Sequence, residues 1–185
     1  MIIGLTGKYA AGKGTVAEVL KRQGFRYHSL SDILREELAQ SGQAESREAL
    51  LAMGNALRRQ GGPGVLAERL VPRLRTGDHI VDSIRNPAEV TALRALDGFV
   101  LLAVDAAPAV RFERLRERAR IGDPTGWEEF TALEARENVS ADPAAQQLLA
   151  TSALADRVLM NDGDIEALEV GVSELLAELR ASVQG

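Results

Sequence analysis

The sequence predicts an α/β protein with a five-stranded parallel sheet and helices on both faces. Apolar runs of strand length recur along the chain, stretches with helical periodicity separate them, and one run is apolar at every position. Alternating strands and helices are typical of a parallel sheet, and a strand that is apolar throughout is expected where both faces of such a sheet are buried. The expected strands are residues 1–6, 25–30, 80–84, 99–104 and 157–160.

The expected helices have recognisable boundaries. Residues 15–22 have an apolar face, and Gly24 follows as a stop signal. Asn86 and Glu89 enclose a proline at the first helical position and form the pattern of a capping box. From Ile165 onward, apolar residues recur at helical spacing, which predicts a last helix packed on the sheet.

Composition limits the function classes. The 185 residues, 45% of them hydrophobic, predict a single domain over residues 1–185. A net charge of -5 argues against a surface that coats nucleic acid. The absence of cysteine excludes a disulfide framework, a thiolate zinc site and a cysteine nucleophile. No apolar run is long enough for a membrane span, so we expect no membrane partner and a cytoplasmic location.

A glycine-rich segment directly follows the first expected strand and opens the first helix. Residues 7–15 read Gly-Lys-Tyr-Ala-Ala-Gly-Lys-Gly-Thr. Glycines let backbone N–H groups wrap an anion, the helix N-terminus adds its positive end, and Lys13 brings charge to the outer phosphates. A glycine-rich turn with an incidental lysine is the alternative, but position and spacing favour a phosphate-binding loop. The residues expected to contact the nucleotide are Gly7, Ala10, Ala11, Gly12, Lys13, Gly14 and Thr15, with Lys13 also catalytic.

One position departs from most such loops. Gly14 stands where a serine or threonine hydroxyl usually holds magnesium, and Thr15 comes one place later. The resulting Gly-Lys-Gly-Thr ending resembles the adenylate-kinase group of nucleoside monophosphate kinases. This resemblance implies a three-layer P-loop fold, ATP and Mg²⁺ as cofactors, and a metal held largely through water near Thr15 and Asp82.

The acceptor side is suggested by residues 28–35, which read His-Ser-Leu-Ser-Asp-Ile-Leu-Arg. They resemble the adenylate-kinase segment that begins the acceptor-binding helix, which implies that Asp32 and Arg35 bind the acceptor. A planar guanidinium suits a phosphate because it donates two parallel hydrogen bonds. A solvated helix arginine is the alternative. The acceptor-binding insertion is expected at about residues 31–75, where Arg58 and Arg59 are further candidates, although paired arginines are more often a surface feature.

The third expected strand ends in an acid that is followed by an arginine. Residues 80–85 read Ile-Val-Asp-Ser-Ile-Arg and resemble the aspartate-to-arginine turn of the same kinases. Ligands of open α/β sheets bind beyond the carboxyl ends of the strands. We therefore expect Asp82 to orient magnesium-bound water and Arg85 to hold the acceptor phosphate and act in catalysis. A capping or surface role is the alternative for both.

Residues 111–120 carry arginines on more than one helical face. An exposed helix with ion pairs at three- and four-residue spacing explains them without function. Alternatively, the helix leads into a lid at about residues 116–140, in which Arg114 and Arg118 neutralise the transferring oxygens and Arg136 is a weaker candidate.

Asn161 and Asp162, after the last strand, resemble the nucleoside-contacting turn of adenylate kinases and dephospho-coenzyme A kinases. A helix-capping turn is equally good chemistry for these two residues.

Most of the chain resembles an archaeal group of adenylate-kinase-related proteins and the kinase-like part of some deoxycytidylate deaminases, including residues 83–85 and 128–137. The implied activity is transfer of the γ-phosphate of ATP to a (deoxy)nucleoside monophosphate or a similar small acceptor. Residues 4–7 repeat the Gly-Leu-Thr-Gly opening of dephospho-coenzyme A kinase, the first alternative, but its acidic, proline-containing acceptor strand is not recognisable. An ATP-binding switch with weak ATPase activity is the second. The sequence specifies neither the acceptor nor the oligomeric state.

Overall fold

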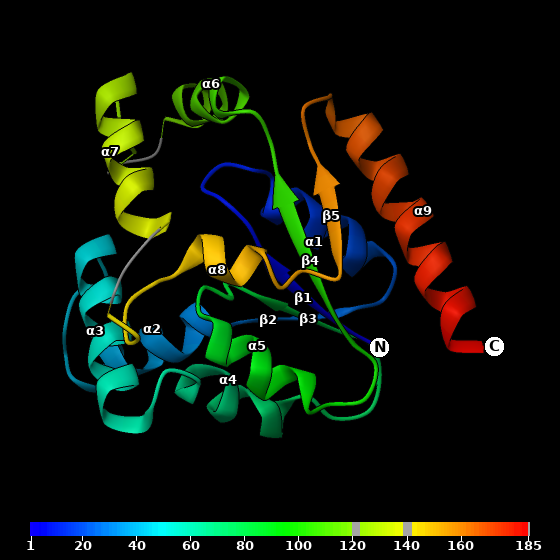
Figure 1. The fold of residues 1–185 in the computed structure, drawn as a ribbon. Coiled ribbons are helices and arrows are strands. Elements are labelled where there is room, and N and C mark those ends of the chain that lie inside the picture. Colours follow the sequence, from blue (N-terminus) through cyan, green and yellow to red (C-terminus); the bar gives the residue numbers. More distant parts are fainter. Residues whose placement is uncertain (120–122, 139–141, 185) are drawn as a thin grey trace.

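The computed structural model describes residues 1–119, 123–138 and 142–184, and it shows one parallel sheet between two helical layers (Figure 1). The strands are β1 (Ile2–Thr6), β2 (Arg26–Ser29), β3 (His79–Asp82), β4 (Phe99–Asp105) and β5 (Arg157–Met160), in the spatial order β2-β3-β1-β4-β5. The helices are α1 (Lys13–Arg22), α2 (Leu30–Gln40), α3 (Arg47–Gly61), α4 (Val65–Leu70), α5 (Pro87–Arg94), α6 (Pro108–Arg118), α7 (Trp127–Asn138), α8 (Leu148–Ser152) and α9 (Ile165–Gln184), with a 3-10 turn η1 at Val71–Arg73. The predicted five-stranded parallel α/β fold is confirmed.

All strand pairings are parallel, so the carboxyl ends of the strands meet at one edge of the sheet. Ile3 of β1 lies opposite Ile80 of β3 and Val100 of β4, and Val104 lies opposite Leu159 of β5. In Figure 1 the arrowheads of β4 and β5 point toward α6. The loops that follow these strand ends form the candidate site.

Two hydrophobic clusters cover the two faces of the sheet. On one face, α1 and α9 bury Val16, Leu20, Val172 and Leu176 against the strands. On the other face, α2, α3, α4 and α5 pack their apolar side chains against the sheet residues Ile2, Val81 and Leu101. Burying the strands on both faces explains the uninterrupted apolar run of β4.

Several strand and helix boundaries differ from the prediction. The predicted strand 80–84 stops at Asp82 because Ser83 adopts a left-handed conformation with φ 66°. The predicted strand 25–30 stops at Ser29, whose side chain accepts the N–H of Ser31 and caps α2. The first helix begins at Lys13, two residues earlier than predicted, and Gly12 is its N-cap. The predicted capping box of Asn86 and Glu89 is present at the start of α5.

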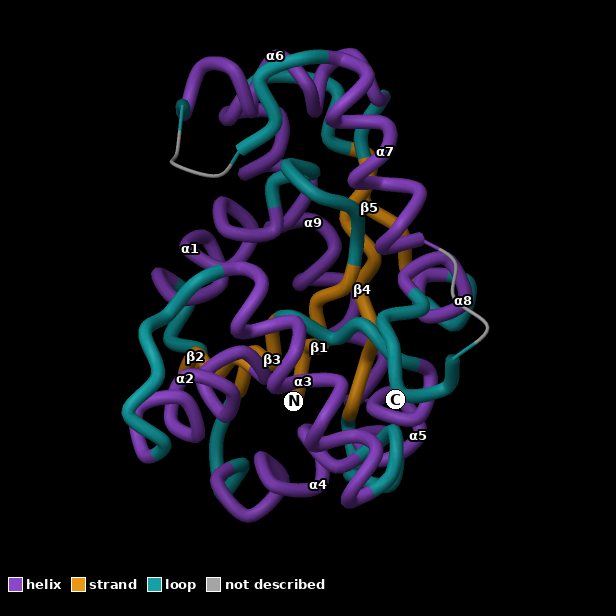
Figure 2. Tube along the Cα trace, turned by 90° about the vertical axis from the view of Figure 1, so that its left-hand side faces the viewer, coloured by secondary structure: helices purple, strands orange, loops and turns teal. Residues whose placement is uncertain are grey.

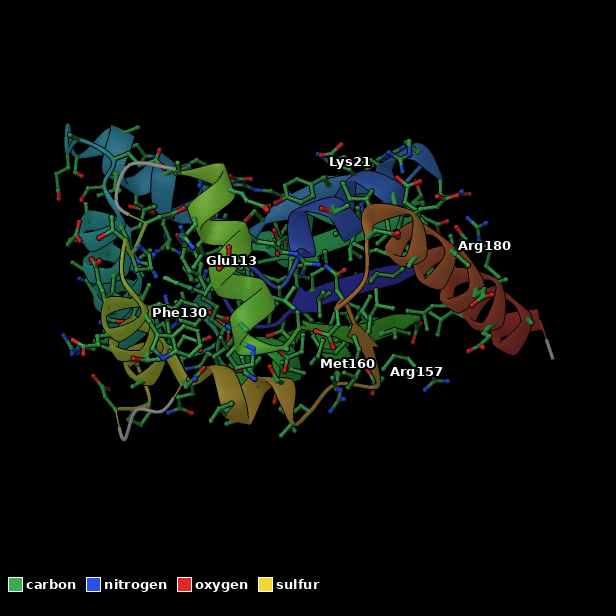
Figure 3. All side chains as sticks on the ribbon, turned by 90° about the horizontal axis from the view of Figure 1, so that it is seen from above. Lys21, Glu113, Phe130, Arg157, Met160 and Arg180 are labelled. Carbon is green, nitrogen blue, oxygen red and sulfur yellow. The ribbon has the colours of Figure 1, made fainter. Side chains whose placement is uncertain are left out.

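Helices α6 and α7, which we call the lid helices, lie at one end of the molecule above β4 and β5 (Figure 2). They pack through the rings of Phe112, Trp127 and Phe130, whose centroids lie 5.4 to 5.5 Å apart. Figure 3 labels Glu113 on α6 and Phe130 on α7. Of the predicted lid at residues 116–140, residues 120–122, 139 and 140 and the side chain of Arg136 lie outside the described part of the chain.

Strand β5 is an edge of the sheet, and two of its apolar side chains are largely exposed to solvent. Val158 is 61% exposed and Met160 is 58% exposed. Figure 3 shows Met160 and Arg157 at the margin of the molecule. None of the helices in the described ranges is both long and apolar enough to span a membrane.

Candidate nucleotide-binding site

The loop between β1 and α1 has the backbone conformation of an anion cradle. Gly7 has φ 135°, and a Cβ atom there would lie 2.0 Å from the carbonyl oxygen of Val104. Gly12 has φ 102°, and a Cβ atom there would lie 2.2 Å from the Nδ2 atom of Asn161. Both positions therefore require glycine, for backbone conformation and for space. The N–H groups at the start of α1 open into this loop, where an anion is favoured.

Two lysines of the loop are held by neighbouring oxygens. The Nζ atom of Lys13 donates to the carbonyls of Gly7 and Lys8, at 2.6 and 2.9 Å, so the side chain folds back over the loop. The ammonium group of Lys8 lies 2.9 Å from a carboxylate oxygen of Asp105, at the carboxyl end of β4. This places both positive charges at the loop.

The turn after β5 closes one side of the loop. Asn161 is buried, and its Nδ2 atom donates to the carbonyl of Ala11 at 2.9 Å. Asp162 accepts the N–H of Ala107 at 2.6 Å, which joins the turn to the start of α6. The guanidinium of Arg114 donates to the carbonyls of Asn161 and Gly163, at 2.8 and 3.1 Å.

A pocket of about 610 Å³ lies between this turn and the start of α1. Its lining includes Gly12 and Thr15 from the phosphate loop and α1, Arg114 from α6, and Asn161 and Ile165 from the turn and α9. The volume is in the range of small-molecule sites. Of the residues predicted to contact the nucleotide, Gly12, Thr15 and Asn161 line this pocket, together with Arg114.

The residues predicted to lie near magnesium offer few direct metal ligands. Asp82 accepts the Tyr27 hydroxyl at 2.8 Å and the N–H of Ser83 at 2.6 Å. A Cβ atom on Gly14 would meet no heavy atom within 4 Å, so a side chain has room there but the chain supplies no hydroxyl. No group of three metal-binding side chains occurs among the described residues. These residues fit a hydrated ion held with the nucleotide phosphates better than a cage made of protein ligands.

The predicted acceptor residues belong to two separate groups of contacts. Arg35 donates to Asp32 at 2.7 Å and to Glu45 at 3.0 Å. Arg85 donates to the amide oxygen of Gln146 at 3.0 Å. Strands β2 and β3 are neighbours, and the Ser29 hydroxyl at the end of β2 reaches that of Ser83 at 3.1 Å. Asp32, Arg35 and Arg85 thus follow adjacent strand ends without a described contact between the two arginines.

Arg58 is placed differently from its predicted role. It is only 4% exposed, and its Nη2 atom lies 2.7 Å from a carboxylate oxygen of Glu89, which is fully buried. The second oxygen of Glu89 accepts the N–H groups of Arg85 and Asn86. A guanidinium held in this way has a structural role at the turn after β3, and we leave Arg58 out of the proposed acceptor site. Neighbouring Arg59 is exposed and pairs with Asp142.

Arg118 contacts the phosphate loop through Tyr9, a residue that the sequence analysis did not single out. Its guanidinium donates to both carboxylate oxygens of Asp123, at 2.7 and 3.0 Å, and lies over the ring of Tyr9. The Tyr9 hydroxyl also donates to Asp123. Burial and then the hydrogen bond to Asp123 raise the pKa of Tyr9, so its hydroxyl stays protonated. An aromatic residue inside a glycine-rich loop was the only sequence signal for this contact.

Arg111 was also missed. Buried at the base of α6, it donates to the carbonyl of Ala106 at 2.8 Å and pairs with Glu134 of α7. It reaches the carbonyl of Tyr9 at 3.4 Å as well. This arginine connects the lid helices to the phosphate loop, and no short sequence pattern distinguishes it from its exposed neighbours.

A phosphate loop after the central strand of a β2-β3-β1-β4-β5 parallel sheet, with a pocket beside it, defines a protein with the P-loop kinase fold, which is a nucleotide-binding fold. Solved structures agree. Shikimate kinase from Aquifex aeolicus aligns with a TM-score of 0.58 at 18% identity, covering 100% of this chain and 99% of that chain. TT1252 from Thermus thermophilus aligns with a TM-score of 0.58 at 26% identity, covering 97% of both chains.

Sequence relatives identify the family. A family model described as an AAA domain matches residues 3–132. A UPF0200 protein of Hyperthermus butylicus is 34% identical over 182 residues, which cover 97% of this chain and 95% of that protein. A UPF0200 protein of Pyrococcus horikoshii is 36% identical over 145 residues, covering 74% and 78%. The chain belongs to the AAA domain family of this model and to the UPF0200 family.

Proposed function

We propose that this protein is an ATP-dependent kinase of the adenylate-kinase-related group, which transfers the γ-phosphate of ATP to a nucleoside or deoxynucleoside monophosphate. The observation that carries the proposal is the pocket shared by the phosphate loop and the turn after β5. Gly12 and Thr15 line the same pocket as Arg114 and Asn161. A nucleoside in that pocket would present its phosphates to the N–H groups at the start of α1.

In the proposed reaction, an oxygen of the acceptor phosphate forms a bond to the γ-phosphorus of ATP. The bond from that phosphorus to the bridging β–γ oxygen breaks, and ADP leaves with the electron pair. Negative charge spreads over the transferring oxygens, and we assign its stabilisation to Lys13, which folds over the phosphate loop, and to Arg118, which lies over the ring of Tyr9. Mg²⁺, when bound with ATP, would neutralise further phosphate charge, with Asp82 and Thr15 holding its water ligands.

The acceptor is proposed to bind beyond the ends of β2 and β3. Asp32 and Arg35 follow β2, and Arg85 follows β3. Arg35 is now paired with Asp32 and Glu45, so an acceptor phosphate would have to replace or share these carboxylates. Charge-assisted contacts of a guanidinium with phosphate are strong enough for such competition.

The test is phosphorylation of a panel of acceptors by ATP, with release of ADP as the readout. The panel contains nucleoside and deoxynucleoside monophosphates, dephospho-coenzyme A, and shikimate and gluconate, the last two because kinases of these compounds share the fold. We expect a nucleoside monophosphate to give the highest turnover. The Lys13→Ala variant is expected to lose at least about a hundredfold of that turnover while keeping its thermal unfolding transition, because the lost charge serves phosphates rather than packing.

Other outcomes would change the assignment. Preference for dephospho-coenzyme A would replace the proposed acceptor. If no acceptor raises ATP turnover above background, the protein is better described as an ATP-binding switch. Unchanged turnover in Lys13→Ala would remove Lys13 from the mechanism.

A further inference from the structure

Three parts of the molecule that are far apart in sequence meet at the ring of Tyr9. Tyr9 belongs to the phosphate loop, Arg47 begins α3 in the acceptor-binding insertion, and Arg118 ends α6. The guanidinium carbons of Arg47 and Arg118 lie 4.6 and 4.7 Å from the ring centroid. Asp123, after α6, accepts from the Tyr9 hydroxyl and from Arg118.

Two guanidinium groups within 4.7 Å of the centre of one ring place two positive charges beside the same loop residue. Each group is attracted to the negative face of the ring, which offsets part of their mutual repulsion. The ammonium groups of Lys8 and Lys13 lie in the same loop as this ring. Carboxylates such as Asp123 and Asp105 balance part of the charge. A concentration of cations beside an anion cradle is the arrangement expected where the outer phosphate of a polyphosphate binds.

We propose that Arg47 is a ligand of the γ-phosphate of ATP, and that Tyr9 positions it together with Arg118. The inference rests on the proposed function and adds to it a phosphate ligand from the acceptor-binding insertion and a positioning residue in the phosphate loop. Tyr9 is suited to this role because it lies between Gly7 and Gly12, in the segment that wraps the phosphates. A flat ring there provides a platform for planar guanidinium groups.

Asp123 also has a place in this arrangement, as the carboxylate that holds the guanidinium of Arg118. It binds two donors of Arg118 in this structure, whereas a guanidinium has five N–H donors in all. A γ-phosphate oxygen can therefore be bound through the remaining donors or by exchange with the carboxylate. Arg47 belongs to the predicted acceptor-binding insertion, so its contact with the ring of Tyr9 also joins that insertion to the phosphate loop.

The experiment compares binding of ATP and ADP, each with Mg²⁺, to the full chain by titration calorimetry. If Arg47 contacts the γ-phosphate, Arg47→Gln should weaken ATP binding about tenfold and ADP binding by less than about twofold, the change expected for loss of a hydrogen bond to a charged group. Arg73→Gln is the matched control, because Arg73 lies in the same insertion and pairs with Glu36 at the surface. It should change neither affinity. Equal weakening of ATP and ADP by Arg47→Gln, or no weakening, would overturn the assignment.

Tyr9 is tested by two further variants. Tyr9→Phe keeps the ring and should keep the preference for ATP over ADP, whereas Tyr9→Leu removes the ring and should reduce that preference as far as Arg47→Gln does. A Tyr9→Leu protein that retains the preference would show that the ring does not position the arginines. Arg47→Lys, which keeps the charge but loses the planar fork, should restore part of the ATP affinity and guards against a variant that fails to fold.

Binding of ATP and ADP can be measured whether or not an acceptor is found. A failed acceptor screen would therefore count against the proposed kinase activity and leave the assignment of Arg47 to be decided by the binding data alone.

The single tryptophan of the sequence, Trp127, lies on α7 in contact with Phe112 and Phe130. Its fluorescence provides an independent readout of nucleotide binding near the lid helices.

Discussion

Gly12 lies at the junction of three parts of the candidate site. It caps α1, it lines the pocket, and its missing side chain leaves room for the amide of Asn161, which donates to Ala11. Gly14, only two residues further on, has open space around it. Of these two glycines, only Gly12 stands at a position where the structure requires glycine.

The pair provides a matched test. Gly12→Ala should destabilise the protein by about 1–3 kcal/mol, because alanine is strained at φ 102° and its Cβ would displace Asn161. Gly14→Ala should leave stability unchanged or raise it by up to about 1 kcal/mol, because alanine is the better helix former and meets no neighbour. Thermal unfolding without nucleotide measures both. Equal stability of the two variants would contradict this account of Gly12.

Helix α3 is attached to α5 by a buried ion pair. Arg58 and Glu89 are both buried, and Glu89 also holds the backbone of the turn after β3. Removing one partner of a buried pair leaves an uncompensated charge away from water, which costs more than the pair itself contributes. The position of α3 relative to α5 therefore depends on this contact.

We expect Arg58→Met to lower the free energy of unfolding by about 3–5 kcal/mol, the range for breaking a buried ion pair. Arg59→Met is the control, since Arg59 is exposed and its pair with Asp142 is screened by solvent. Urea unfolding of both variants gives the comparison. A small effect of Arg58→Met, similar to that of Arg59→Met, would contradict the role given to this ion pair.

Strands β2 and β3 are joined by a pair of histidines. The Nε2 atom of His28 lies 3.0 Å from Nδ1 of His79, and Nε2 of His79 lies 2.9 Å from the carbonyl of Arg75. A carbonyl only accepts, so Nε2 of His79 carries the hydrogen of its contact with Arg75. Burial, then His79, Arg73 and Arg26, lower the pKa of His28, and Asp32 opposes them.

This pair predicts a pH dependence of stability. Unfolded His28 binds a proton near about pH 6.5, whereas folded His28 binds it only at lower pH, so stability should fall as pH drops from about 6.5 toward the lowered folded pKa. His28→Gln keeps a donor and should flatten this part of the profile. Urea midpoints between about pH 7.5 and pH 5 measure the slope. An equal slope in both proteins would remove His28 as its source.

At the scale of the whole molecule, an overall negative charge coexists with cations at the phosphate loop. The chain carries a net charge of -5, but Lys13, Arg47, Arg114 and Arg118 gather around the phosphate loop and its pocket. Carboxylates lie among these cations, with Asp105 and Asp123 at the loop and Glu117, Asp164 and Glu166 at the pocket, so the charge of the site is mixed. Overall charge therefore says little about the ligand.

Periodicity and spacing were enough to predict the strands of the sheet, the phosphate loop and the capping box at Asn86. The pattern that signals each of these lies within a short stretch of sequence. The contacts of Tyr9 and Arg58 were not predictable in this way. Tyr9 meets Arg47 and Arg118, and Arg58 meets Glu89, across long stretches of chain. Only the packing of helices on the sheet determines which arginine is buried and which one reaches the loop.

The open edge at β5 has a consequence for how the protein behaves among copies of itself. A strand with unpaired backbone groups along one side and two exposed apolar side chains, Val158 and Met160, is a template for the addition of another strand. Arg157 places a positive charge on the same short strand, which opposes such stacking. We therefore expect the short edge strand β5 to be a place where copies of this chain associate at high concentration.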